Sequence, residues 1–168
     1  MNQNVNNKGG IKPAFIKYRM WSQYADDHRG VALLLSKNKL CMTIKKYFTE
    51  SAFFGPVKYR SNHTFDIELN GDSLSDEQYM RKFIINKRNE IFFKKHIDYR
   101  DENEYRILII DDKFEDIFID FKKCFIGIIL GDRFHEVYFP IVKGFMDKYK
   151  TKAWKLSFWN CRYNLCEI

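Results

Sequence analysis

Long apolar runs are absent from this chain of 168 residues, and so are the common sequence signatures of export and catalysis. No apolar run reaches the about 18 residues that a membrane-spanning helix needs. The first ten residues, MNQNVNNKGG, lack the apolar segment of a secretory signal. Phosphate-loop, dinucleotide-fingerprint and zinc-protease motifs are missing, as are Ser and Cys nucleophile elbows. The sequence therefore predicts a cytoplasmic protein with no membrane partner.

Cysteine is scarce and unpaired in the sequence. The four residues are Cys41, Cys124, Cys161 and Cys166, and the last two are five positions apart. This spacing predicts reduced, partly buried thiols in a cytosolic protein. A zinc site needs closely spaced pairs of ligands, which the chain does not offer. We therefore expect no metal.

The charge is positive but dispersed. The chain has 29 Lys and Arg against 22 Asp and Glu, a net charge of +7. Such a balance suits a nucleic acid or another polyanion. The lysine pairs, however, lie far apart, at 45–46, 94–95 and 122–123. Dispersion of this kind favours a lysine-rich soluble surface over a dedicated binding groove.

Length and composition predict one domain with a bulky core. Hydrophobic residues make up 45% of the chain, and 16 Phe and 10 Tyr contribute much of that volume. The polar, Asn-rich start predicts a disordered segment at 1–12, followed by a single α+β domain at 13–168.

Hydrophobic periodicity defines the expected elements of this domain. A short helix is expected near 40–48, ended by Gly55-Pro56, and a second opens at a capping box of Ser75 and Gln78. The clearest amphipathic helix covers 134–149, where Pro140 is expected to kink or divide it. Strands are expected at 15–20, 31–35 (buried), 57–59, 64–69, 102–110, 117–121, 125–130, 154–159 and 162–165. The fold class is thus α+β, with a mixed, mostly antiparallel sheet and two main helices.

Two segments carry most of the functional signal. Residues 20–30 read MWSQYADDHRG, a turn that leads into the apolar run 31–35. Residues 102–110 read ENEYRILII, which places Glu102, Glu104 and Arg106 at the mouth of a predicted strand. Side chains two residues apart share one face of a strand. Two carboxylates and a guanidinium on one face indicate a site more than a solvated edge.

These segments resemble a bacterial family of unknown function, DUF2971. Its pattern is a Met-Trp-x-x-Tyr-Ala-x-x-His-x-Gly block, a Val-x-Tyr block, and a Lys and an aromatic residue before Glu-x-Glu-Tyr-Arg. Here the pattern is carried by Met20, Trp21, Tyr24, Ala25, His28, Gly30, Val57, Tyr59, Lys95, Tyr99, Glu102, Glu104, Tyr105 and Arg106. The resemblance runs from about Trp21 to near the C-terminus.

One part of that family pattern is missing. Family members usually begin with a segment resembling His-Tyr-Thr-Ser, followed later by an Asn-Asp block, and neither occurs here. The chain therefore resembles the C-terminal portion of a longer member. It is a fragment, one half of a split protein or a diverged short form.

The family pattern is itself similar to that of ADP-ribosyltransferases of the His-Tyr-Glu type, where three motifs on three strands surround an NAD cleft. The absent His-Tyr-Thr-Ser segment would match the first motif. Tyr24 would match the second, and Glu102 or Glu104 the third. This resemblance implies a partial ADP-ribosyltransferase-like fold and a transferase that acts on NAD. Family-level association adds a toxin-type role in phage defence.

The expected chemistry explains these residue types. Breaking the nicotinamide–ribose bond develops positive charge on the ribose, as in glycoside hydrolysis. A fixed carboxylate stabilises that cation, and an aromatic ring stacks on nicotinamide. We expect Glu104 to be the main carboxylate, with Glu102 orienting acceptor or substrate and Tyr24 completing the catalytic set. The expected substrate-binding residues are Trp21, His28, Lys95, Tyr99 and Arg106.

Each residue also has a structural interpretation. Glu104 and Arg106 alone make a common same-face ion pair. Trp21 suits the core, and His28 suits a turn. Lys95 suits a helix end. On the same grounds, the alternative functions are a non-catalytic domain that binds nucleic acid or protein, and a chain that completes a site with a partner supplying the first motif. An exposed apolar sheet edge would be the structural sign of the latter.

Overall fold

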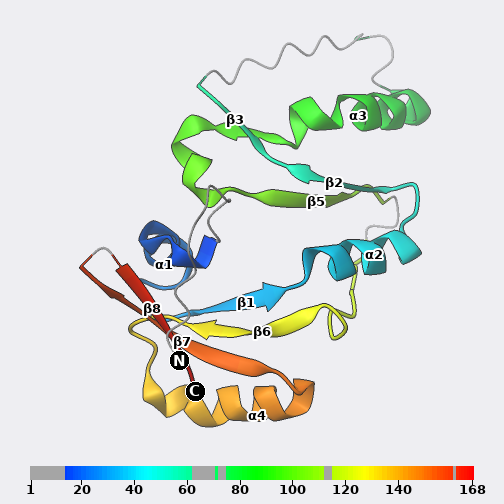
Figure 1. Cartoon of the computed structure of the whole chain (residues 1–168). Helices are drawn as coiled ribbons and strands as arrows, with labels where there is room; N and C mark the ends of the chain where they lie inside the picture. Colours follow the sequence, from blue (N-terminus) through cyan, green and yellow to red (C-terminus); the bar gives the residue numbers. More distant parts are fainter. Residues whose placement is uncertain (1–13, 62–70, 72–74, 112–114, 161) are drawn as a thin grey trace. The chain divides into compact units, whose positions relative to one another are not determined.

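The computed structural model describes all residues except 1–13, 62–70, 72–74, 112–114 and 161. The chain forms two compact units, one made of residues 1–36 and 125–168 and the other of residues 37–124. Each is described by itself (Figure 1). Among the described residues, no helix has both the length and the apolar character to cross a membrane.

A four-stranded sheet forms the first unit. The strands lie in the order β1-β6-β7-β8, where β1 pairs antiparallel with β6, β6 parallel with β7, and β7 antiparallel with β8 (Figure 1). A parallel pair needs a crossover, which α4 provides between β6 and β7. The bounds are Val31–Leu35 for β1, Phe125–Leu130 for β6, Lys152–Trp159 for β7, Arg162–Glu167 for β8 and Phe139–Tyr149 for α4.

The two faces of this sheet pack against different helices. On one face, Ile128 and Leu130 of β6 pack with Val142 of α4. On the other face, Ile129 and Leu156 pack with Trp21 of α1 (Tyr18–Tyr24). Strand β6 alternates its side chains between these two cores, which explains why its residues 127–130 are buried.

The expected strand at 15–20 is wrong. The structure has a 3-10 helix, η1 (Ala14–Ile16), followed by α1. The short apolar stretch was ambiguous in sequence, and burial of Trp21 against the sheet decides it in favour of a helix. The helix expected at 134–149 is divided, which is one of the two effects expected of Pro140: η4 (Glu136–Tyr138) is followed by α4, whose first turn contains Pro140. Its missing N–H has no partner to lose there.

The expected strand at 31–35 is present as β1, but only one of its faces is covered. Ala32 and Leu34 pack in the core, while Val31, Leu33 and Leu35 are 43%, 51% and 37% exposed. β1 is the edge strand of the sheet, and no other described strand pairs with its outer side. The alternation of exposed and packed side chains shows that one face of β1 is left uncovered, which explains why the apolar run is not fully buried.

The second unit contains two short ribbons. β2 pairs antiparallel with β5, and β3 pairs parallel with β4. Its helices are α2 and α3, and the 3-10 helix η3 connects β4 to β5. The bounds are Lys37–Tyr47 for α2, Ala52–Pro56 for β2, Lys58–Arg60 for β3, Glu77–Ile91 for α3, Lys94–His96 for β4, Ile97–Glu102 for η3 and Tyr105–Ile109 for β5.

Three segments of this unit either differ from the expected structure or lie outside the described residues. Gly55 and Pro56 do not end the helix, because α2 already ends at Tyr47; they lie at the end of β2, since an outer strand of a two-stranded ribbon tolerates proline. Residues 117–121 form no strand, although they alternate in sequence. The strand expected at 64–69 lies outside the described residues.

Asp76, not Ser75, caps α3. Its carboxylate accepts the backbone N–H groups of Gln78 and Tyr79, at 2.9 and 3.0 Å. We expect Asp76→Ala to lower the free energy of unfolding by about 1 kcal/mol, because two N–H groups lose their acceptor. Ser75→Ala is the matched control and should change it by less than about 0.5 kcal/mol. Urea denaturation followed by circular dichroism measures both, and equal losses would contradict the assignment.

The α+β class and the mixed, mostly antiparallel pairing are confirmed. The single domain expected at 13–168 stays a prediction, since the two units are described separately. The disordered segment expected at 1–12 lies outside the described residues.

Candidate functional site

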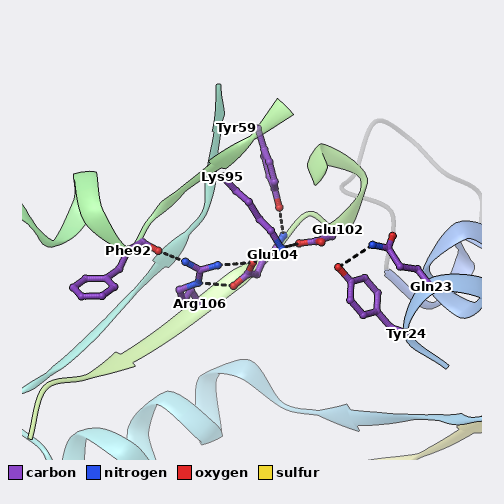
Figure 2. A network of polar contacts seen from close by, with 8 residues as sticks. All are labelled: Gln23, Tyr24, Tyr59, Phe92, Lys95, Glu102, Glu104 and Arg106. Atoms are coloured by element: carbon purple, nitrogen blue, oxygen red, sulfur yellow. Dashed lines mark hydrogen bonds and ion pairs between the residues drawn. The ribbon is translucent and has the colours of Figure 1, made fainter. Parts of the chain in front are cut away.

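An ion pair with two parallel contacts joins Glu104 to Arg106 in the second unit (Figure 2). Arg106 Nε donates to Glu104 Oε1 at 2.6 Å, and Nη2 donates to Oε2 at 2.9 Å. The third guanidinium nitrogen, Nη1, donates to the carbonyl of Phe92. This fork geometry is the strong form of an arginine–carboxylate contact.

Lys95 connects the two carboxylates. Its Nζ lies 2.5 Å from Glu102 Oε2 and 3.7 Å from Glu104 Oε2. The Glu102 side chain is 9% exposed, compared with 27% for Glu104. Figure 2 shows the Lys95 side chain reaching toward both carboxylates. Two cations and two anions thus form one compact cluster, which we call the charged quartet: Lys95, Glu102, Glu104 and Arg106.

The backbone that builds the quartet differs from the expected strand. Glu102 ends η3, Asn103 adopts a left-handed conformation with φ of 50°, and β5 begins only at Tyr105. The expectation that Glu102 shares a strand face with Glu104 and Arg106 is therefore wrong. A left-handed residue reverses the chain locally, which Asn tolerates better than most residues. Glu102 nevertheless lies beside Glu104, because both carboxylates contact the Lys95 ammonium.

Two further contacts fix the quartet. The Glu104 backbone N–H donates to the Tyr59 hydroxyl at 2.9 Å, and Tyr59 pairs with Lys95 across β3 and β4. Opposite Arg106 on β2 stands Gly55, whose missing side chain leaves room for the Phe93 ring. Tyr59 and the Phe92 carbonyl are not among the sequence-predicted site residues. Tyr59 belongs to the Val57-x-Tyr59 block, and this was the only signal for it.

Electrostatics make Arg106 a permanent cation. The hydrogen bond from Arg106 to Glu104 raises the pKa of the guanidinium above its already high ordinary value, and partial burial opposes this only in part. On β5 next to it, burial and the nearby Cys41 raise the pKa of Tyr105. Neither group changes its charge near neutral pH, so the Arg106 guanidinium of the quartet stays positively charged there.

Tyr99 adds an aromatic surface to the quartet. Lys95 Nζ lies 4.7 Å from the centroid of its ring, within the range of a cation–π contact. Tyr99 is 39% exposed, so part of the ring remains available for stacking. The structure therefore brings together five predicted site residues: Lys95, Tyr99, Glu102, Glu104 and Arg106.

The other three predicted residues, Trp21, Tyr24 and His28, lie in the first unit. Trp21 is 2% exposed, and its indole N–H donates to the Phe15 carbonyl at 2.7 Å, as suits a core residue. Tyr24 is 56% exposed near the end of α1. Their proximity to the quartet stays a prediction, because the two units are described separately.

His28 is buried, with 1% of its surface exposed. Its ring lies among Tyr18, Trp21 and Phe158, with centroids 4.1, 6.5 and 5.7 Å away. Neither ring nitrogen has a hydrogen-bond partner among the described residues. A substrate contact by His28 would require this aromatic cage to open.

The turn that carries His28 is strained. Asp26, Asp27 and His28 have φ values of 45°, 47° and 71°. Such conformations are uncommon for residues other than glycine. The φ of Gly30 lies outside the left-handed region; a Cβ there would lie 3.1 Å from the Ala25 backbone, so close packing favours glycine. Arg133 pairs with Asp27 and helps to hold the turn.

No group of three or more metal-ligating side chains occurs in the part of the chain that the structure describes. The charged quartet itself is built from ion pairs between its own side chains. Its chemical capabilities are to hold an anion on its cations and to place a carboxylate beside a developing positive charge.

Comparison with known proteins gives one match. The profile of a family described as "Protein of unknown function (DUF2971)" matches residues 20–107, more than half of the chain. The matched range includes the whole quartet, Tyr59 and the turn that carries His28. No curated protein and no solved structure matches.

Proposed function

The chain belongs to the family of proteins of unknown function DUF2971, and we propose that it is an NAD-dependent ADP-ribosyltransferase-like effector of the toxin or phage-defence type. The observation that carries the proposal is the charged quartet. Its two carboxylates lie beside each other, each paired to a cation, with an exposed tyrosine ring next to them. This combination matches what cleavage of a nicotinamide riboside bond needs.

In the proposed reaction, the bond between the nicotinamide nitrogen and the ribose C1′ breaks, and its electron pair leaves with nicotinamide. An acceptor nucleophile then forms a bond to C1′ and gives up its proton. Positive charge builds on the ribose between these events. Glu104 stabilises that charge, and Glu102 orients the ribose or the acceptor. A ring such as Tyr99 offers a stacking surface for a base.

The test is NAD binding and NAD consumption by the whole chain and by Glu104→Gln. We expect saturable binding to both proteins and a loss of turnover of about 100-fold or more in the variant, because a fixed charge opposite the transition state is removed. Thermal melting verifies that the variant folds. Full turnover by Glu104→Gln, or no NAD binding by either protein, would overturn the proposal.

Glu90→Gln is the matched control for this test. Glu90 is also a carboxylate of the second unit, paired with Lys94 at 3.1 Å, but it lies on α3 outside the quartet. The substitution therefore changes net charge by the same amount. Its turnover should equal that of the unchanged chain.

A second candidate is that this chain completes a site together with a polypeptide that supplies the His-Tyr-Thr-Ser segment. The exposed apolar face of β1, at the edge of its sheet, favours it, because an edge strand can pair with an added strand. On this reading, NAD turnover appears only when the partner is added. Leu33→Lys on β1 would then abolish the turnover that addition of the partner produces.

A further inference from the structure

The cations of the charged quartet are occupied by its own carboxylates, and we infer that they form a diphosphate-binding site masked by Glu102 and Glu104. A diphosphate ligand would take Arg106 and Lys95 and release Glu104. The inference rests on the proposed function only for the identity of the whole substrate, a dinucleotide. The masking itself follows from the contacts of four side chains.

The geometry at one oxygen atom indicates what the cations can hold. Glu104 Oε2 lies 2.9 Å from Arg106 Nη2 and 3.7 Å from Lys95 Nζ, so the two cations converge on the same acceptor. An anion placed there would meet a guanidinium and an ammonium at once. Phosphate oxygens fit the arginine fork as carboxylate oxygens do. Two adjacent cations suit two linked phosphate groups.

Access and anchoring also fit a ligand site. The side chains of Arg106 and Lys95 are 29% and 28% exposed, so water and an anion can reach them. Arg106 is held from behind by the Phe92 carbonyl through Nη1, and this contact does not involve Glu104. The guanidinium thus keeps its position when its carboxylate partner leaves. Lys94, by comparison, is joined to Glu90 by a single ion pair at 3.1 Å.

Competition between Glu104 and a diphosphate predicts the direction in which diphosphate affinity changes when Glu104 is substituted. If Glu104 and a diphosphate share Arg106, removing the negative charge of Glu104 must strengthen diphosphate binding. If Glu104 merely supports the local fold, the same change leaves binding unaltered or weakens it. Glutamine keeps the size and one acceptor oxygen for Arg106, which preserves packing. The expected gain is about fivefold in affinity, the size of a partly exposed ion pair.

The experiment is titration of the full chain with inorganic pyrophosphate by calorimetry at constant ionic strength. We expect Glu104→Gln to bind about fivefold more tightly than the unchanged chain. The double variant Glu104→Gln/Arg106→Gln should lose at least about tenfold relative to Glu104→Gln, because the fork is gone. Changing both partners leaves no unpaired carboxylate, so this variant is expected to fold, and thermal melting checks it.

Glu90→Gln again provides the control for net charge. It adds the same charge to the second unit but frees only Lys94. Its pyrophosphate affinity should match that of the unchanged chain within twofold. An equal gain in Glu90→Gln and Glu104→Gln would overturn the inference, as would unchanged or weaker binding by Glu104→Gln, or no binding by any variant.

The same proteins separate this inference from the proposed function. Pyrophosphate binding that tightens in Glu104→Gln, without NAD binding or turnover, supports the masked site and rejects the transferase. NAD turnover that depends on Glu104, with pyrophosphate binding indifferent to it, supports the transferase and rejects the masking. When both hold, one substitution strengthens anion binding and abolishes turnover, opposite effects that a purely structural role does not produce.

Discussion

The substitution Gly131→Ala is expected to destabilise the first unit strongly. Gly131 follows β6 and crosses directly over the strained turn at Asp26 to His28. An added Cβ would lie 2.8 Å from the His28 carbonyl carbon, nearer still to its oxygen, and 3.1 Å from the Gly30 oxygen. These are backbone atoms, which cannot rotate away as a side chain can.

Hydrogen bonds on both sides prevent the backbone from yielding. The Gly131 N–H donates to the Gly30 carbonyl, and the Arg133 N–H donates to the His28 carbonyl, both at 3.0 Å. We expect Gly131→Ala to lower the free energy of unfolding by at least about 3 kcal/mol, the upper range for overpacking. Urea denaturation followed by far-ultraviolet circular dichroism measures the loss.

Gly144→Ala is the matched control. Gly144 lies within α4, and a Cβ there would meet no atom within 4 Å. Alanine has the higher helix propensity, so this variant should gain about 0.5–1 kcal/mol. Two variants with the same added methyl group should therefore differ in sign. A Gly131→Ala protein as stable as the unchanged chain would show that the turn relaxes and is not held by β6.

Periodic segments of this sequence predict its elements well where burial follows the period. The apolar run 125–130 is β6, and the stripe at 134–149 gives η4 and α4. The strand predictions for 15–20 and 117–121 were wrong because a few alternating apolar residues fit more than one structure. For 15–20, packing of Trp21 against a sheet distant in sequence decided the outcome, and local propensity carries no information on that.

The candidate site was predictable in its composition but not in its geometry. The two-residue spacing allowed a structural interpretation of Glu104 and Arg106 as an ion pair, and that pair exists. Glu102 reaches the same cluster by another route, through a left-handed Asn103 and the ammonium of Lys95. The anchor from Tyr59 depends on a parallel pairing between β3 and β4, which are far apart in sequence. Nonlocal pairing of this kind leaves no local pattern.

Alanine at position 21 is expected to produce a loss of stability as large as that at Gly131. Trp21 is 2% exposed and joins Ile129 and Leu156 in the core beneath α1. Its indole N–H also donates to the Phe15 carbonyl. Truncating a buried aromatic residue costs about 3–5 kcal/mol, because both its burial and its packing are lost.

Trp159→Ala is the control that makes this prediction specific to position. Trp159 belongs to the same unit and is 79% exposed at the end of β7. Its removal should change the free energy of unfolding by less than about 0.5 kcal/mol. Circular dichroism is the suitable readout, since each variant alters tryptophan fluorescence by design.

The comparison also decides which role Trp21 has within the family block at 20–30. A core residue loses stability on truncation, and any ligand affinity falls only through the unfolded fraction. A ligand contact loses affinity while the protein stays folded. We expect the first result, because the Trp21 ring is enclosed by the sheet, by Phe15 and by the His28 ring. A folded Trp21→Ala protein that no longer binds NAD would instead place Trp21 in the substrate site.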